Sequence, residues 1–292
     1  MRTTMDIRTL FELFALAAVC ACGAKAEEWK VPSRDGVPIS VQKSGAGPAL
    51  LLVHGSGSDA GFTWYAVLPA LSKQFTVYAM DRRGRAASGD SKKYSLSAEA
   101  ADIAAVANRI GQPFTLVAHS YGALCALAAL DQLKNVTNLI LYEPPLLANA
   151  PGPEWAKTVE QMERALAGND REEVVTLFLR NAIGVPPQAI EGIRGSPAWK
   201  KQVETAGTLP RETRAVGAYR LPAAQLARWK VPTTMLLGSQ SQGYIKEATP
   251  LVCNAIPGCR IVTLENQGHL AMANAPDLFI AKVIEAVRNE AR

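Results

Sequence analysis

Histidine is scarce in this sequence, with only three copies in 292 residues. Neither the spacing of these histidines nor any cluster of carboxylates matches the ligand sets that hold metal ions, so we expect no metal and no other cofactor. The scarcity also narrows the search for a general base, because each histidine can be considered in turn.

An apolar run long enough to cross a membrane is missing as well. The run at 13–22 is too short for a spanning helix. Two arginines precede it and Ala24-Lys25-Ala26 follows it, a pattern typical of a secretory signal and its cleavage site. We therefore expect residues 1–26 to be removed and the mature protein to be exported, either to a periplasm or out of the cell. Lipid attachment at Cys22, which follows small residues, is the alternative and also means export.

Charge of one sign is not concentrated anywhere in the chain. The formal net charge is +5, and it falls to +4 without residues 1–26, which carry three basic and two acidic side chains. The basic residues are spread along the sequence instead of forming a stripe, so we infer neither nucleic acid nor an anionic membrane as a partner. A small molecule is the expected partner.

Cysteine is rare too, with five copies. Cys20 and Cys22 belong to the expected signal or its edge. Cys125 falls on the inner face of a helical pattern and is expected to be a small buried apolar residue. Cys253 and Cys259 flank a turn and could form a disulfide in an oxidising compartment, but the sequence leaves that geometry open.

Strand and helix patterns alternate along most of the chain, which is typical of a single large α/β domain with a doubly wound sheet. Several strand patterns are continuously apolar, as in strands buried on both faces of a parallel sheet. Strands are expected at 29–31, 37–42, 49–53, 75–80, 114–117, 137–142, 233–237 and 260–264. Helices are expected at 63–73, from a Ser97 cap to 110, after Ser120 to 130, at 244–255 and at 276–289.

One region lacks strand patterns. Residues 148–228 contain several helical segments broken by glycine and proline, with scattered tryptophans, and we interpret them as a helical cap. This divides the expected core into a first part, 27–147, and a second part, 229–292.

The stretch around Ser120 is the most informative in the chain. An apolar strand pattern ends at Ala118-His119-Ser120-Tyr121-Gly122, and a helical run begins at once. So abrupt a turn needs small residues two positions either side of its apex, and it projects the apex side chain outward. Alanine stands at 118 where glycine is usual. The alternative is that Ser120 merely caps an ordinary helix.

A serine nucleophile needs a base, and elimination among the histidines favours His269. His54 is held in a turn, which we place on the far side of the strand order. His119 neighbours Ser120 and should therefore point elsewhere. His269 follows the last strand in a short loop, 266–269, from which a side chain could reach the turn.

The base in turn needs a carboxylate to orient it. The turn at 238–241, which follows the penultimate strand and where an acid would be expected, contains none. Glu247 falls within a helix and should face solvent. Glu143 ends the strand after the Ser120 helix and precedes two prolines, so we assign the acid to Glu143, with a solvated rim carboxylate as the alternative.

Two backbone N–H groups are expected to face a developing oxyanion. One belongs to Tyr121, in the first turn of the helix, and the other to Ser56 in the turn after the strand at 49–53. Gly55 and Gly57 would allow that turn to approach a substrate closely.

Four segments together resemble the α/β-hydrolase superfamily: His54-Gly-Ser-Gly, Asp81-Arg-Arg-Gly-Arg, Ala118-His-Ser-Tyr-Gly and Gln267-Gly-His269. The resemblance covers the mature chain except the cap. It implies a mostly parallel doubly wound sheet, with the cap inserted after the strand that follows the nucleophile helix. Some haloalkane dehalogenases of the superfamily place the acid after that strand, which supports Glu143. Ser120 in place of aspartate argues against dehalogenation and epoxide hydrolysis.

The expectation is therefore a serine hydrolase that cleaves a small, largely apolar ester, thioester or lactone through an acyl-enzyme. A C–C bond hydrolase or a cofactor-free haloperoxidase-like enzyme would use the same triad. A non-catalytic binding protein on the same fold is the third possibility, motivated by Ala118 and by the turn without an acid.

Overall fold

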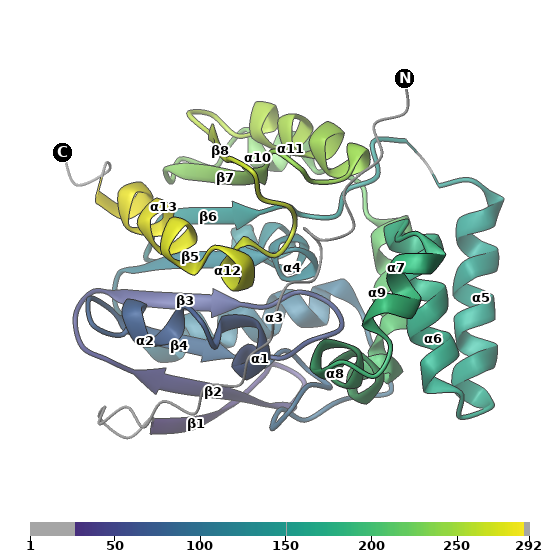
Figure 1. Cartoon of the computed structure of the whole chain (residues 1–292). Helices are drawn as coiled ribbons and strands as arrows, with labels where there is room; N and C mark the ends of the chain where they lie inside the picture. The colour runs from purple at the N-terminus through teal and green to yellow at the C-terminus, as the bar shows by residue number, and fades with distance from the viewer. Residues whose placement is uncertain (1–26, 150, 289–292) are drawn as a thin grey trace.

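The computed structural model describes residues 27–149 and 151–288, and Figure 1 shows a central sheet with helices on both faces. The expected signal at 1–26 lies outside the described residues, as does Asn289 at the end of the last expected helix. Within the described part of the chain, no helix is long and apolar enough to cross a membrane.

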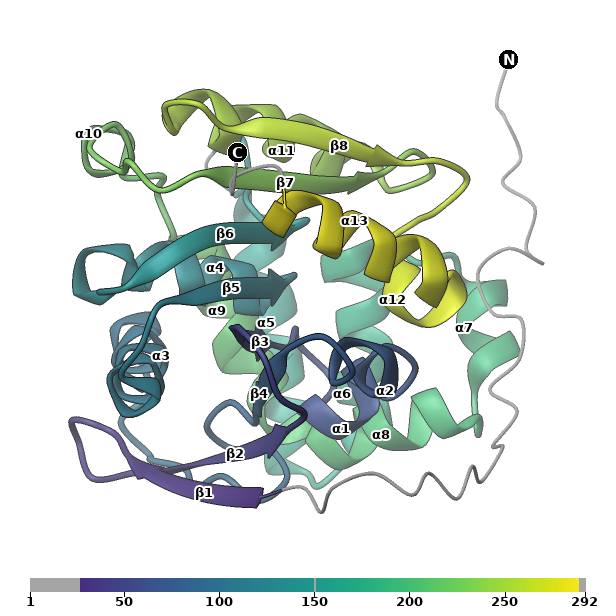
Figure 2. The same cartoon turned by 90° about the vertical axis from the view of Figure 1, so that its left-hand side faces the viewer.

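The sheet has eight strands in the order β1-β2-β4-β3-β5-β6-β7-β8. Figure 2 shows them stacked from β1 at the bottom to β8 at the top. The hairpin of β1 and β2 is antiparallel and joins β4 in antiparallel register, and every other pairing is parallel. The strands are β1 Glu27–Pro32, β2 Pro38–Ser44, β3 Ala49–Val53, β4 Thr76–Met80, β5 Phe114–His119, β6 Val136–Tyr142, β7 Thr233–Gly238 and β8 Arg260–Leu264.

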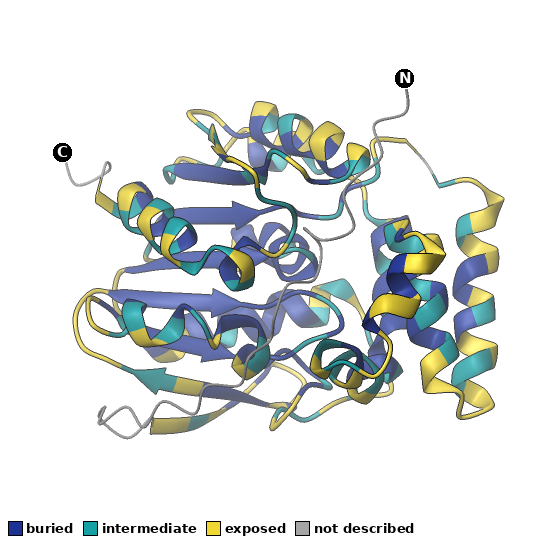
Figure 3. Ribbon diagram, in the orientation of Figure 1, coloured by how far each residue is buried: buried dark blue, intermediate teal, exposed yellow. Residues whose placement is uncertain are grey.

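Helices cover both faces of this sheet, so its central strands are buried throughout (Figure 3). Alternate residues of β3 serve the two faces: Leu51 belongs to one apolar cluster and Leu52 to the other. The first cluster includes side chains of α3 (Leu96–Ile110), α4 (Tyr121–Ala129) and α11 (Gly243–Ala255). The second includes side chains of α1 (Ala60–Trp64), α2 (Leu68–Leu71), α12 (Ala271–Asn274) and α13 (Pro276–Arg288). The expected α/β-hydrolase fold with a mostly parallel doubly wound sheet is confirmed.

The segment between β6 and β7 is helical. Its helices are α5 Pro153–Ala167, α6 Arg171–Leu177, the π-helical η3 Phe178–Ile183, α7 Pro187–Ile193, α8 Pro197–Thr205, the 3-10 turn η4 Ala206–Thr208, α9 Leu209–Ala218 and α10 Ala223–Leu226. Side chains from all the elements from α5 to α9, with η3 and η4 included, form a separate apolar cluster around Met162, Val174 and Trp199. Leu226 of α10 packs instead in a cluster of the sheet. The boundaries 148 and 228 stay a prediction.

This helical insertion lies beyond one end of the sheet. The arrowheads of β3 and β6 point toward it in Figure 1, so the carboxyl ends of the parallel strands face the insertion. Ligand sites of open α/β sheets lie at that end.

Two helix predictions were wrong in detail. The expected helix at 63–73 is two short helices, α1 and α2. The helical conformation ends after α1, and Pro69 lies in the first turn of α2, where proline is favoured. The cap of α3 is Ser95, whose side chain accepts a hydrogen bond from the N–H of Ala98, whereas Ser97 lies inside the helix. Both serines suit a cap by composition, and only the extended backbone at 95 distinguishes them.

The three cysteines among the described residues form one free thiol and one disulfide. Cys125 is a free, fully buried residue of α4. Cys253 and Cys259 form a disulfide, with Cα atoms 5.3 Å apart, that joins the end of α11 to the start of β8. The pairing that the sequence left open is therefore present.

Candidate active site

The chain turns from β5 into α4 at a single residue, Ser120. Its backbone has φ 53° and ψ −126°, and a positive φ is strained for a residue with a side chain. The Ser120 N–H donates to the carbonyl of Tyr142 at 2.8 Å, and its own carbonyl accepts from the N–H of Ala123 at 2.8 Å. Its hydroxyl makes no capping hydrogen bond to α4, so Ser120 is not an ordinary helix cap.

The turn at Ser120 packs tightly against the loop that follows β3. A Cβ added to Gly122 would lie 2.3 Å from the carbonyl oxygen of His54, and one added to Gly55 would lie 2.8 Å from the Cβ of Ser120. Only glycine fits both positions without displacement. Ala118 is fully buried and is accommodated where glycine is usual. The β3 loop therefore lies directly beside the Ser120 side chain.

The structure pairs Glu143 with His269. The Nδ1 atom of His269 lies 2.5 Å from Oε2 of Glu143, and Glu143 is fully buried. Its other oxygen, Oε1, accepts from the N–H of Gly238 at 2.7 Å and from Oγ of Ser241 at 2.5 Å. The turn that lacks an acid thus supplies two donors to the acid on the neighbouring strand. Glu247, the other carboxylate considered, is exposed on α11.

His119 packs against the loop that carries His269, whereas we expected its side chain to point elsewhere. Its ring lies 4.5 Å from the ring of His269, centroid to centroid. Its Nε2 lies 2.9 Å from the carbonyl oxygen of His269, which only accepts, so Nε2 carries the proton. Tyr142 adds to this support, because its hydroxyl donates to the Gly268 carbonyl and accepts from the N–H of Ala271.

His54 is excluded as a base for a different reason from the one the sequence suggested. Its strand, β3, is the direct neighbour of β5, so His54 is not on the far side of the strand order. Its Nε2 accepts from the N–H of Arg82 at 3.1 Å, and its Nδ1 lies 2.8 Å from the carbonyl of Gly55. Both ring nitrogens are occupied, and the ring is fully buried.

A buried ion-pair cluster joins the β3 loop to the insertion. Arg82 donates to Glu99 of α3 at 2.6 Å, to Glu212 of α9 at 2.8 Å and to the carbonyl of Gly55 at 3.1 Å. Arg85 donates to the same oxygen of Glu212 at 2.8 Å. These four charged side chains are at most 1% exposed. From the sequence, the segment Asp81-Arg-Arg-Gly-Arg was noted only as part of the family resemblance. The run of arginines directly after a buried strand was the signal available for this cluster.

The two residues expected to provide backbone donors lie near Ser120. Tyr121 is the first residue of α4, so its N–H has no acceptor within the helix. Its phenol oxygen lies 2.6 Å from that of Tyr94. Ser56 lines both of the cavities that Ser120 lines.

These two cavities meet at Ser120. The larger has a volume of about 220 Å³ and is also lined by Glu143 and His269. The smaller, of about 30 Å³, is lined by Ser56, Ser120 and Glu212 among mainly apolar side chains. The insertion supplies most of the apolar lining of the larger cavity, through Phe178, Leu179, Ile183, Val185 and Ile193.

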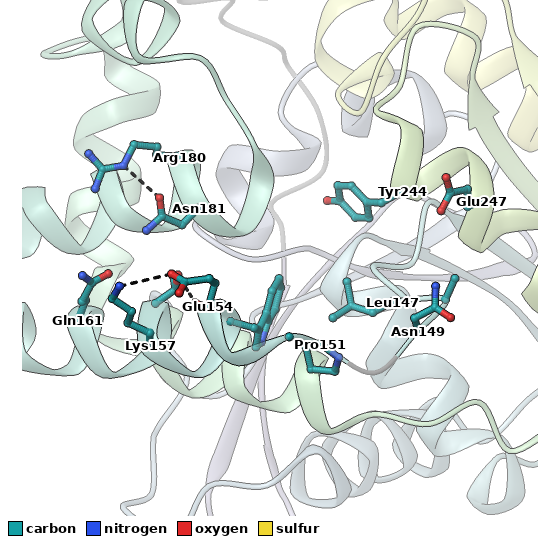
Figure 4. A pocket seen from close by; sticks show the side chains of 14 residues that line it. Leu147, Asn149, Pro151, Glu154, Lys157, Gln161, Arg180, Asn181, Tyr244 and Glu247 are labelled. Atoms are coloured by element: carbon teal, nitrogen blue, oxygen red, sulfur yellow. Dashed lines mark hydrogen bonds and ion pairs between the residues drawn. The ribbon is translucent and has the colours of Figure 1, made fainter.

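A wider cleft of about 660 Å³ lies outside the site and does not include Ser120. Figure 4 shows Glu154, Lys157 and Gln161 of α5 on one side and Tyr244 and Glu247 of α11 on the other. Tyr244 lines this cleft and both inner cavities, so it lies at the boundary between the cleft and the Ser120 site. Burial raises the pKa of Tyr244 to about 12.

Burial also determines the protonation of two histidines. It lowers the pKa of His54 well below the ordinary value, and the charges of Arg82 and Arg85 lower it further. Burial lowers the pKa of His119 in the same way, with a smaller contribution from His269. Both rings are therefore neutral near pH 7.

Comparison with known proteins gives a consistent result. A family model described as "Alpha/beta hydrolase family" matches residues 50–282. A pimeloyl-[acyl-carrier protein] methyl ester esterase from Aeromonas hydrophila is 26% identical over 255 residues, which are 85% of this chain and 98% of that protein. The crystal structure of an alpha/beta hydrolase from Sphaerobacter thermophilus has a TM-score of 0.79 and 32% identity, covering 88% of this chain and 99% of that one. An esterase from Exiguobacterium antarcticum shares the fold, with a TM-score of 0.73 and 21% identity over 90% of this chain and 100% of that one.

The buried histidines lead to a prediction about pH. A histidine whose pKa is lowered by folding stabilises the fold above its unfolded pKa of about 6.5, and this stability is lost as the pH falls toward the folded pKa. We expect the ring signals of His54 and His119 in two-dimensional ¹H–¹⁵N spectra to keep the neutral pattern between about pH 5 and 8. The variants His54→Gln and His119→Gln assign the two signals. A titration midpoint for either ring inside that window would contradict the assignment.

Proposed function

The chain belongs to the alpha/beta hydrolase family, and we propose that it is a serine hydrolase that cleaves a small, largely apolar carboxylic ester through an acyl-enzyme. Thioesters and lactones are chemically similar substrates for the same attack. The hydrogen bond between Glu143 and His269, at the carboxyl ends of the strands and in the cavity that contains Ser120, carries the proposal.

The proposed steps follow from the pairing of Glu143 with His269 and from the place of Ser120 in the same cavity. The hydroxyl of Ser120 attacks the ester carbonyl, and Nε2 of His269 takes its proton. Glu143 holds the proton on Nδ1 and stabilises the imidazolium that forms. The imidazolium then protonates the leaving alcohol, and water releases the acid by the reverse sequence of proton transfers. Because Glu143 is already held by Gly238 and Ser241, it need not move during these steps.

The negative charge of the tetrahedral intermediate needs donors that are in place before the reaction. We assign this role to the backbone N–H groups of Tyr121 and Ser56. The amino end of α4 adds the positive end of its dipole. Arg82, through its hydrogen bond to the carbonyl of Gly55, positions the loop that carries Ser56.

An ester as substrate is supported by the relatives and by the cavity. The Aeromonas hydrophila relative is a methyl ester esterase, as its name states. The cavity beside His269 has a volume of about 220 Å³ and a largely apolar lining, which suits an apolar leaving group of moderate size.

We also propose that the protein is exported after removal of residues 1–26. The support comes from the sequence pattern of that segment and from the Cys253–Cys259 disulfide, a bond that persists in oxidising compartments. We expect the mass of the exported protein to correspond to a chain that begins near Glu27. A chain that retains Met1 would contradict export by this signal, and a lipid-modified Cys22 would show the alternative processing.

The nucleophile is tested by exposing the protein to a fluorophosphonate and measuring its intact mass. We expect one adduct, which is absent in Ser120→Ala. The control variant Ser58→Ala should retain it, because the Ser58 hydroxyl is hydrogen-bonded to Thr63 and has no role in the proposed reaction. Hydrolysis of phenyl esters should fall by at least ~10³-fold in Ser120→Ala with the fold retained. Unchanged hydrolysis in that variant would overturn the proposal.

The acid is tested by Glu143→Gln. Without the charge, His269 loses both its orientation and the stabilisation of its protonated form, so we expect kcat to fall by ~10³- to 10⁴-fold. Glu247→Gln makes the same chemical change on the exposed face of α11 and should leave kcat within about twofold, since surface substitutions rarely disturb a distant site. A large loss in Glu247→Gln with little in Glu143→Gln would assign the acid to Glu247 instead.

A further inference from the structure

The loop that carries His269 has little packing of its own. It runs from 265 to 270, between β8 and α12, and none of its residues is buried. Leu270, beside the histidine, is 40% exposed. A general base must lie within hydrogen-bond reach of the nucleophile, and a displacement of about 1 Å can cost ~10²-fold in rate. Because apolar burial does not hold this loop in place, its position depends on hydrogen bonds.

Three successive carbonyl groups of the loop, at 267–269, accept hydrogen bonds from three neighbouring strands. The first accepts from the N–H of Gln240, in the turn after β7, at 2.8 Å. The second accepts from the hydroxyl of Tyr142, the last residue of β6. The third accepts from Nε2 of His119, the last residue of β5, at 2.9 Å. Since β7, β6 and β5 are neighbours in the sheet (Figure 2), the loop crosses the carboxyl edge of the sheet toward Ser120.

The last two donors lie side by side. His119 and Tyr142 are partners in the parallel register of β5 and β6, so their side chains leave the sheet on the same face. Their ring centroids are 5.2 Å apart, and the ring of His269 lies 4.5 Å from the first and 6.1 Å from the second. Both donors are buried, whereas the loop above them is not. Two rings fixed by close packing therefore bear the loop.

Burial also fixes the protons that these two side chains donate. It raises the pKa of the Tyr142 phenol well above its ordinary value, so the hydroxyl keeps its proton. It lowers the pKa of His119, so this ring is neutral and has one N–H. Nδ1 of His119 has no hydrogen-bond partner among the described residues, so the proton is on Nε2, which faces the carbonyl of His269. A neutral ring also puts no like charge beside the imidazolium that the proposed reaction forms.

We propose that His119 and Tyr142 are positioning residues, which hold the backbone of His269 where its ring can exchange a proton with Ser120. The inference rests on the proposed function. The bond from Glu143 fixes only one atom of the His269 ring, Nδ1, so the ring still moves with its backbone. Tyr142 binds the carbonyl before His269 and the N–H two residues after it, and His119 binds the carbonyl of His269 itself. These bonds remove the remaining freedom.

The ring of His119 also fills the space between two loops of the site. A Cβ added to Gly55, in the loop after β3, would lie 3.1 Å from Nδ1 of His119. A substitute at 119 must therefore match the length of histidine, or both loops shift. Glutamine does so and carries a donor at the corresponding position, whereas methionine has a similar length and no donor.

The first test compares His119→Gln with His119→Met through kcat and KM for phenyl propanoate. We expect the glutamine variant to keep kcat within about fivefold of the wild-type value, and the methionine variant to lose ~10- to 10²-fold, because only glutamine can still hold the loop. KM should change by less than about threefold in both, since the step affected is proton transfer and not binding. Equal kcat values in the two variants would overturn the role of His119.

The second test compares two tyrosines. Tyr142→Phe keeps the ring but removes its hydrogen bonds to the loop, so we expect kcat to fall by about tenfold or more with KM little changed. Tyr219→Phe removes the same atom from a hydroxyl that is enclosed without a partner among the described residues. It should leave kcat within about twofold, because no hydrogen bond is lost. If Tyr142→Phe retains as much activity as Tyr219→Phe, Tyr142 does not position the base.

The rate of labelling by a fluorophosphonate separates positioning from a general loss of structure. We expect folded His119→Met to be labelled completely at Ser120, but ~10- to 10²-fold more slowly than the wild type, because the nucleophile is less activated. Incomplete labelling at the wild-type rate would mean that part of the protein is unfolded, and would contradict the inference. Thermal unfolding followed by circular dichroism shows whether each variant folds. If His119→Met does not, the two tyrosine variants decide.

The wild-type protein separates this inference from the proposed function. If it is labelled at Ser120 and hydrolyses phenyl propanoate, but neither pair of variants differs, only the positioning inference fails. If it is neither labelled nor active on phenyl esters, the proposed function fails and the inference fails with it.

Discussion

The buried carboxylate of Glu143 is the constraint on which the rest of the site depends. A carboxylate with no exposure must have its acceptor positions filled, and two segments fill them: the loop that carries His269, and the end of β7 with the turn after it, which supplies Gly238 and Ser241. The same bonds therefore orient His269 and hold the ends of β6, β7 and β8 together. The turn without an acid, which first suggested a binding protein without catalysis, is the turn that secures the acid.

A second buried cluster performs a similar task on the other side of Ser120. Arg82 joins the loop after β3 to α3 and to α9 of the insertion, so the position of the Gly55 carbonyl depends on contacts made by the insertion. Removing a single partner from such a cluster strongly destabilises the fold, because the remaining charge is left buried and uncompensated. The insertion is thus tied to the core by charge as well as by apolar packing, and one of its carboxylates, Glu212, reaches the cavity that contains Ser120.

The division of the site into two cavities follows from where the insertion lies. The π-helical segment η3 places Phe178 and Ile183 in the walls of both cavities, and Tyr244 lines both of them as well as the wider cleft. In the proposed mechanism the sheet supplies the reacting groups in a geometry common to many chemistries, whereas the insertion sets the size and polarity of what binds. Under that proposal, substrate choice is a property of the contacts between the two parts.

The sequence by itself determined the fold class, the strand and helix order, and the candidates Ser120 and His269, because periodicity, abrupt turns and the scarcity of histidine are local signals. It also pointed to Glu143, through its place after a strand. Only the tertiary structure placed His119 beneath His269, paired Arg82 with Glu212 and turned Gly238 and Ser241 into donors for Glu143. These contacts join residues about a hundred or more positions apart, and such pairs leave no periodic pattern. They arise from packing alone, so the chain had to be folded before they could be seen.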